Sequence, residues 1–296
     1  MAEALNDGWT YRARVGPDGE REPLVAWLAR HYRHTPAAGW SDRVLEGEVE
    51  VDGRVVDGAL PLRRGQEVAW HRPPWREPEV PLDFTLVHED AEVVLVSKPS
   101  GLPTLPSGGY LRHTLLARVR DRWPEATPMH RLGTGTSGLV VFARTASARR
   151  TLQAAWRAGG VERGYRAVLS GRPDWRATVV EVPIGPVPHP LLGTLHAASA
   201  TGAAARTRFR VVGAHGRHTL ADVRIDTGRP HQIRIHAACV GHPLAGDPLF
   251  LPGGGARDDV RATDGGYLLH AHVLTLPDLG SGGVRSWSHP ASWEAA

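Results

Sequence analysis

Apolar positions after residue 82 form short alternating or continuous runs, a pattern typical of β-strands. The runs lie at residues 93–96, 139–143, 165–169, 204–212, 219–225 and 267–276. Helical spacing of apolar residues predicts three helices between them, at about 112–123, 146–158 and 231–240. Strands outnumber helices and do not alternate with them regularly. We therefore expect an α+β fold with a mixed, largely antiparallel sheet rather than a doubly wound one.

The pattern differs before residue 72, where a small α+β module is expected over residues 10–72. Residues 24–32 carry apolar positions at helical spacing, and residues 48–56 contain an Asp-Gly turn between two short strands. Residues 73–81 contain four prolines, which predicts an extended linker with little helix or sheet. The sequence thus predicts three parts: the module, the linker and a larger domain over residues 82–296.

Composition places this chain among ordinary globular proteins, with 41% hydrophobic and 22% charged residues. No apolar run is typical of a signal peptide or approaches the roughly 20 residues of a membrane span, so we expect no membrane association. The single cysteine, Cys239, excludes an intrachain disulfide and favours a reducing, cytoplasmic compartment. We interpret Cys239 as a small apolar filler of the third helix.

Arginine dominates the basic residues, because Lys98 is the single lysine among 35 Lys and Arg. Arginine suits phosphate and base recognition, although a GC-rich genome also favours its codons. Residues 142–172 contain seven Arg and one acidic residue, whereas residues 10–80 contain 11 Arg and 12 acidic residues. A positive surface is therefore expected in the larger domain.

Two segments carry candidate chemistry. Residues 129–145 place a polar, glycine-rich loop directly before an apolar strand, which allows a backbone to approach a ligand closely. Residues 227–236 open a helix with two Arg and two His around a glycine turn, an arrangement that favours anions. Taken singly, each segment also fits an ordinary turn.

Together the motifs resemble the RluA-type pseudouridine synthases, and the resemblance covers roughly residues 80–290. Five motifs occur in the family's order: Lys98–Leu102, His130–Leu132 with Thr136–Gly138, Arg163–Gly171, Gly228–His236 and Gly241–Asp247. Residues 10–72 resemble, in degenerate form, the small S-four-like RNA-binding module that often precedes this domain. The resemblance implies isomerisation of uridine to pseudouridine in a structured RNA, either rRNA or tRNA. It implies no cofactor.

The resemblance also implies a set of site residues. Tyr165 corresponds to the family's stacking tyrosine, Arg234 to the arginine that pairs with the catalytic aspartate, and Arg131 to a residue of base flipping. Apolar walls are expected from Leu132 and Ile233. The remaining residues expected to contact RNA are His130, Thr136, Ser137, Arg229, His231 and Gln232.

The sequence departs from the family pattern at Gly133, which occupies the position of the catalytic aspartate. Glycine cannot act as nucleophile or base, so we expect Arg234 to find another anion: an RNA phosphate, Asp226 or Asp247. The sequence His-Arg-Leu-Gly at residues 130–133 resembles the corresponding sequence of a subgroup of the family. Two hypotheses follow: an active synthase that uses another group, or a catalytically inactive RNA-binding protein or RNA chaperone that retains the fold.

Other kinds of site receive less support. His231, His236 and His242 suggest a metal site, but the segment offers no cysteine ligand and no acidic cluster, so no metal is expected. Ser137 is not preceded by the strand-to-helix turn of a hydrolase nucleophile. We expect a monomer whose partner is RNA.

Overall fold

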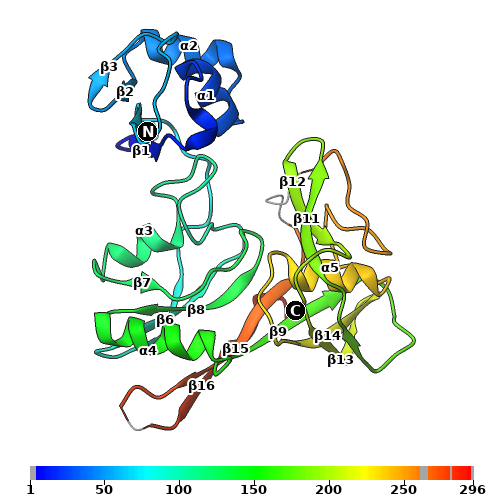
Figure 1. The fold of residues 1–296 in the computed structure, drawn as a ribbon. Coiled ribbons are helices and arrows are strands. Elements are labelled where there is room, and N and C mark those ends of the chain that lie inside the picture. Colours follow the sequence, from blue (N-terminus) through cyan, green and yellow to red (C-terminus); the bar gives the residue numbers. More distant parts are fainter. Residues whose placement is uncertain (1–4, 261–265, 281, 295–296) are drawn as a thin grey trace. The chain divides into compact units, whose positions relative to one another are not determined.

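The computed structural model describes residues 5–260, 266–280 and 282–294. The chain divides into two compact units, Met1–Glu77 and Pro78–Ala296, and the division falls inside the proline-rich segment 73–81. Each unit has its own hydrophobic core. Figure 1 shows the helices and strands of both units. Within the described residues, no helix is long and apolar enough to cross a bilayer.

The first unit is a four-stranded antiparallel sheet in the order β1-β4-β2-β3 with two short helices. Its elements are β1 (Trp9–Arg14), η1 (Pro17–Gly19), α1 (Leu24–His31), α2 (Ala37–Leu45), β2 (Val49–Val51), β3 (Arg54–Val55) and β4 (Glu67–Arg72). Asp52 and Gly53 have φ values of 50° and 75°, so the predicted Asp-Gly turn joins β2 and β3 as expected. Trp27, Trp40 and Trp70 are buried in its core.

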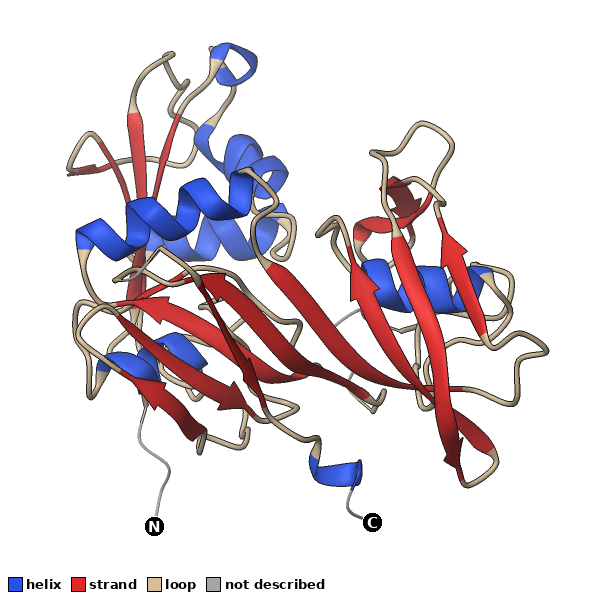
Figure 2. Cartoon of the chain, turned by 90° about the horizontal axis from the view of Figure 1, so that it is seen from below, coloured by secondary structure: helices blue, strands red, loops and turns tan. Residues whose placement is uncertain are grey.

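The second unit is built on one large sheet, to which ten strands belong among the residues described (Figure 2). The main order is β10-β13-β14-β9-β15-β8-β6-β5, with β16 on β15 and β7 on β8. Its strands are β5 (Thr85–Glu89), β6 (Val93–Lys98), β7 (Thr127–Pro128), β8 (Ser137–Ala143), β9 (Glu162–Leu169), β10 (Ala177–Val180), β13 (Thr207–His215), β14 (His218–Ile225), β15 (Leu269–Pro277) and β16 (Val284–Ser288). All pairings are antiparallel except β8 with β15. The predicted α+β class is confirmed.

The three predicted helices of this unit are present but shorter than expected. They are α3 (Leu115–Arg120), α4 (Ala146–Arg157) and α5 (Gln232–Cys239), and a short η2 (Ser292–Glu294) follows β16. Thr114 and Thr145 accept hydrogen bonds from the backbone amides three residues later, so these side chains set where α3 and α4 begin. The start of α3 predicted at residue 112 was therefore wrong.

Two further differences concern strands. A hairpin of β11 (Ile184–His189) and β12 (Gly193–Ala198) forms a separate two-stranded sheet that the sequence pattern did not predict. Its alternation is interrupted by Pro186 and Pro188, which obscured the strand signal. The last long strand begins at Leu269 rather than at Tyr267, which leaves Tyr267 in the segment before β15.

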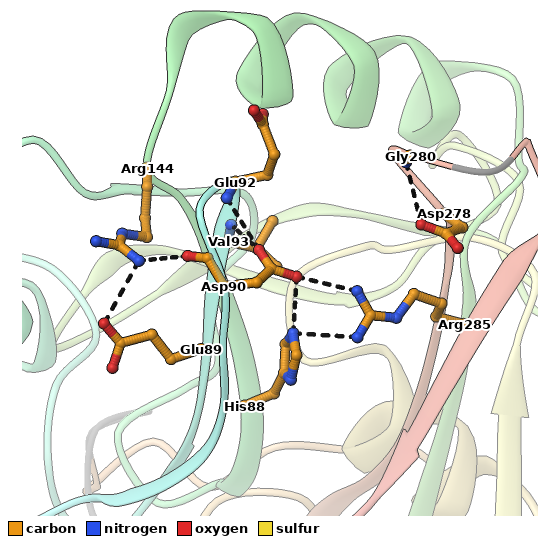
Figure 3. A network of polar contacts seen from close by, with 9 residues as sticks. All are labelled: His88, Glu89, Asp90, Glu92, Val93, Arg144, Asp278, Gly280 and Arg285. Carbon is orange, nitrogen blue, oxygen red and sulfur yellow. Dashed lines mark hydrogen bonds and ion pairs between the residues drawn. The ribbon is translucent and has the colours of Figure 1, made fainter.

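A polar network fixes the turn between β5 and β6 (Figure 3). Asp90 accepts hydrogen bonds from the amides of Glu92 and Val93, from His88 and from Arg285 of β16. Burial opposes ionisation of Asp90, but these donors outweigh it and hold the pKa of the carboxyl below its ordinary range. The network therefore joins β16 to the edge of the sheet, away from the motif loops.

Candidate active site

Strands β8 and β15 meet only at their beginnings, where His270 pairs with Ser137 and Ala271 with Gly138. Gly138 has a φ of 108°, and a Cβ there would lie 2.3 Å from the carbonyl oxygen of Ala271. Only glycine permits this approach of the two backbones. The glycine-rich loop therefore enters the sheet at the point where the two strands diverge.

The loop is held by hydrogen bonds from the segment after β6. Thr104 Oγ1 donates to the Leu132 carbonyl at 2.8 Å, and Ser100 Oγ donates to the Gly135 carbonyl at 2.8 Å. Lys98 Nζ donates to the carbonyls of Leu102 and Thr134 at 2.7 and 3.2 Å. Burial lowers the pKa of Lys98 to about 7. These contacts fix the loop backbone before any substrate binds.

A buried hydrogen-bond network positions the start of α5. Gln232 Oε1 accepts from the Thr227 hydroxyl and the Arg229 amide, while its Nε2 donates to the Arg206 carbonyl and to Thr207. Its side-chain amide is therefore used inside the protein, and Gln232 acts by positioning the turn. The adjacent His231 has a φ of 55°, a conformation that costs free energy for a non-glycine residue and is often found at functional sites.

Arg234 is buried and paired with Asp247. Its Nε and Nη2 donate to the two carboxylate oxygens of Asp247 at 2.7 and 2.8 Å, and the side chains are 2% and 0% exposed. One carboxylate oxygen also accepts from the amides of Leu249 and Phe250. Of the anions expected for Arg234, the structure thus supplies Asp247; Asp226 instead pairs with Arg206 and Arg208.

Gly133 and Arg234 both lie against Tyr267. A Cβ on Gly133 would be 3.2 Å from the Tyr267 hydroxyl, and the guanidinium carbon of Arg234 lies 4.2 Å from the ring centroid. The Tyr267 hydroxyl also hydrogen-bonds to Thr136 Oγ1 at 3.1 Å. The two motifs, about a hundred residues apart in sequence, are therefore brought together through a tyrosine that the motif analysis did not single out.

Tyr165 belongs to the same hydrophobic cluster as Leu132, Ile233 and Tyr267. It lies on β9 opposite Ala271 of β15 and is 9% exposed. Burial raises the pKa of its hydroxyl, an effect that the nearby Arg163 partly opposes. The structure thus places the tyrosine predicted to stack and the two predicted apolar walls in one hydrophobic cluster.

Arg163 connects three motifs. Its guanidinium lies 2.9 Å from the position of a Cβ on Gly228, and Nη2 donates to the Thr227 carbonyl at 3.5 Å. A side chain at residue 228 would move the flexible end of Arg163, so the glycine leaves room for the guanidinium in its present position. Burial, followed by the charge of Arg163, lowers the pKa of His130 to about 3.

Two predicted contact residues face protein groups. The His130 ring stacks on Trp156 at 5.3 Å, and its Nε2 accepts from the Val141 amide at 3.3 Å. Ser137 Oγ lies 2.9 Å from His270 Nδ1. Both residues therefore support the loop in this structure.

The three histidines that suggested a metal site have separate neighbours. His236 contacts Thr207 and the Val182 carbonyl, His242 contacts the Ser170 carbonyl, and the His231 ring lies 6.1 Å from the ring of Phe250. Within the described part of the chain, no group of three His, Cys, Asp or Glu is arranged to hold a metal ion.

Exposed basic groups lie near the start of α5. Arg131 and Arg229 are exposed, and Arg131 is close enough to His231 to help lower the pKa of that imidazole, although burial is the larger cause.

A groove of about 1040 Å³ also runs along β9, β13 and β14. Arg208 and Arg210 line it, but they pair with Asp226 and Asp222. The predicted arginine excess is therefore partly neutralised in this groove.

Sequence reasoning missed Tyr267, Arg163 and the role of Lys98 as an anchor of the loop. The motif that contains Arg163 was noted because of Tyr165. The available signal for Arg163 was that it lies on the same strand as Tyr165, two residues before it. Tyr267 offered no signal, because nothing in its spacing from Gly133 indicates contact.

Comparison with known proteins identifies the family. The model described as RNA pseudouridylate synthase matches residues 92–239. An uncharacterised RNA pseudouridine synthase of Synechocystis is 40% identical and covers 85% of this chain and 88% of its own length. RNA pseudouridine synthase 5 of Arabidopsis thaliana is 32% identical, with coverages of 93% and 90%. Ribosomal large subunit pseudouridine synthase D of Nitrosomonas europaea is 30% identical, with coverages of 94% and 79%.

Among solved structures, human RNA Pseudouridylate Synthase Domain Containing 1 aligns with a TM-score of 0.56. It is 22% identical and covers 73% of this chain and 86% of its own, so it supports the fold. The fold and the matched motifs define a pseudouridine synthase. This chain belongs to the RNA pseudouridylate synthase family, in its RluA-type branch, and the predicted isomerase reaction on RNA is confirmed.

Proposed function

We propose that this protein converts one or a few uridines of a structured RNA to pseudouridine without a cofactor or metal. The favoured substrate is rRNA, and tRNA is the alternative. The observation that carries the proposal is the meeting of Gly133 and Arg234 on Tyr267, next to Tyr165. Loop and helix start form one site although they are far apart in sequence. The relatives named for ribosomal large-subunit modification favour rRNA as the substrate.

The substrate uridine must leave its stack to reach a buried tyrosine. We assign the stacking of the extruded base to Tyr165, between the apolar side chains of Leu132 and Ile233. Arg131 and Arg229 are exposed and suit the phosphates that flank the extruded nucleotide. Isomerisation then breaks the C1′–N1 bond, turns the base and forms the C1′–C5 bond, so the enzyme must retain the detached base during the turn.

The first unit is assigned a supporting role, as a degenerate S-four-like module over residues 10–72 joined by the linker 73–81 to the synthase domain over 82–296. Its helix α2 and neighbouring strand β4 carry Arg43 and Arg72, which lie over tryptophan rings. We propose that the chain acts as a monomer in the cytoplasm.

Quantitative mass spectrometry of digested rRNA and tRNA from cells with and without the gene tests the function. The expected result is one or a few pseudouridines that disappear with the gene and return with the wild-type copy. An unchanged pseudouridine map, with retained RNA binding by the purified protein, would identify it as a binding protein or chaperone without activity.

A further inference from the structure

We propose that Tyr267 is a catalytic residue of this enzyme, and that its hydroxyl donates a proton to the uracil as the C1′–N1 bond breaks. The inference rests on the proposed function, because it assigns a group to that reaction. It addresses the gap at Gly133, where the resemblance implied a carboxylate and the chain has no side chain.

Two glycines of the loop make room for the tyrosine. A Cβ on Gly135 would lie 2.9 Å from Tyr267 Cε1, and one on Gly133 would lie 3.2 Å from the hydroxyl. The contact at Gly135 is under 3.0 Å, so a side chain there would force the tyrosine ring to move. The contact at Gly133 is tight but longer, and a side chain there would require the hydroxyl to shift by a few tenths of an ångström. Both glycines therefore leave room for Tyr267.

The hydroxyl is placed where a substrate can reach it. Gly133 is exposed, so the space that its missing side chain would fill is open to solvent. An atom bound in that space lies within hydrogen-bond distance of the Tyr267 hydroxyl, and Thr136 Oγ1 approaches the same oxygen at 3.1 Å. Tyr267 as a whole residue is only 4% exposed, so packing holds the direction of its side chain.

The ring of Tyr267 is held by the buried ion pair beside it. The Arg234 guanidinium carbon lies 4.2 Å from the ring centroid, a cation–π contact that fixes the ring. Asp247 is a poor candidate for acid or base, because its side chain is fully buried and its oxygens accept bonds from Arg234, Leu249 and Phe250. Its carboxylate holds Arg234 in place.

The reaction balances with a single proton carrier. The C1′–N1 electron pair passes to the uracil, which leaves a positive charge on C1′ that the ring oxygen of the ribose shares. The Tyr267 proton goes to O2 of the departing base, and the Thr136 hydroxyl donates a hydrogen bond to the phenolate. After the base has turned, the π electrons of its C5–C6 double bond form the C5–C1′ bond. The C5 proton then returns to Tyr267, and the O2 proton moves to N1 through solvent, so uridine and pseudouridine differ by no atom.

Single-turnover kinetics of Tyr267→Phe on an RNA substrate that the wild type modifies tests this role. A lost general acid typically costs 10²–10⁴-fold, so we expect the isomerisation rate to fall by about 100-fold or more. The same variant is then tested on RNA that carries 5-fluorouridine at the target position, and the reaction is monitored as the loss of intact 5-fluorouridine. Fluorine makes the uracil a better leaving group, so the penalty of the variant should be at least about tenfold smaller.

A merely structural tyrosine would lower both rates equally, and that result would overturn the proposal, as would a Tyr267→Phe enzyme with the wild-type rate.

Gly135→Ala, which displaces the ring but keeps the phenol, should show the same substrate-dependent penalty and serves as a second variant if Tyr267→Phe unfolds. Tyr32→Phe and Gly255→Ala are the matched controls, because Tyr32 lies in the other unit and a Cβ on Gly255 meets no atom within 4 Å. A wild type inactive on every RNA refutes the proposed function instead.

Discussion

The buried pair of Arg234 and Asp247 makes a prediction that does not depend on knowing the RNA substrate. Asp247→Asn removes the negative charge but keeps the size of the side chain. Arg234 is 2% exposed, so the variant leaves a guanidinium in the interior without a counter-charge from Asp247. Removing one partner of a buried ion pair typically costs about 3–5 kcal/mol. We expect the free energy of unfolding to fall by that amount.

Urea denaturation followed by circular dichroism and tryptophan fluorescence measures this loss, with the transition of the second unit fitted separately. The double variant Arg234→Met/Asp247→Leu should recover much of the stability, because an apolar pair of similar volume is often as stable as a buried ion pair. Arg118→Ala is the control: Arg118 and Asp121 are 43% and 54% exposed, and such pairs contribute at most about 1 kcal/mol. A loss below about 1 kcal/mol for Asp247→Asn would refute the assigned pairing.

Three further predictions concern the site. Gly133→Asp should lower the isomerisation rate and not raise it. The added Cβ would lie 3.2 Å from the Tyr267 hydroxyl, and Arg234 already has a carboxylate partner in Asp247. A faster variant in single-turnover assays would contradict this. Burial lowers the pKa of His130, His231 and His270 to about 3, 4 and 4, so below about pH 6.5 these histidines bind protons in the unfolded chain but not in the folded protein. The free energy of unfolding should therefore drop by about 1.4 kcal/mol per pH unit for each histidine between pH 6.5 and 4. Equal urea midpoints at pH 7.5 and 5.0 would contradict this. RNA affinity should fall steeply as the salt concentration rises. Arg131→Ala should reduce the slope of log K against log salt by about one phosphate contact relative to the Arg118→Ala control, as filter-binding titrations can measure. An unchanged slope would show that Arg131 does not contact a phosphate.

Local patterns predicted much of the fold because they report local forces. The strand β8 and the helix α4 follow directly from an apolar run and from helical spacing after a threonine cap. Boundaries shifted where a side-chain cap decided them, as at Thr114. The proline-containing hairpin β11–β12 was missed because proline interrupts the alternation that marks a strand.

The candidate site was predictable only as far as the motifs reach. Asp247 could be named as a partner of Arg234 because both lie in recognisable segments. Tyr267 could not be identified, since its contact with Gly133 spans the chain and depends on how β15 enters the sheet. The same contact changes the interpretation of Gly133: the glycine makes room for a phenol, which sequence patterns do not encode.

Tritium release from RNA labelled at C5 of uridine tests the central claim most directly, because the C5 hydrogen is lost only when C5 bonds to C1′. Purified wild-type protein, incubated with rRNA from cells that lack the gene, should release tritium to a plateau of one or a few equivalents per RNA. Tyr267→Phe should approach the same plateau about 100-fold or more slowly. No release above background by the wild type would contradict the account.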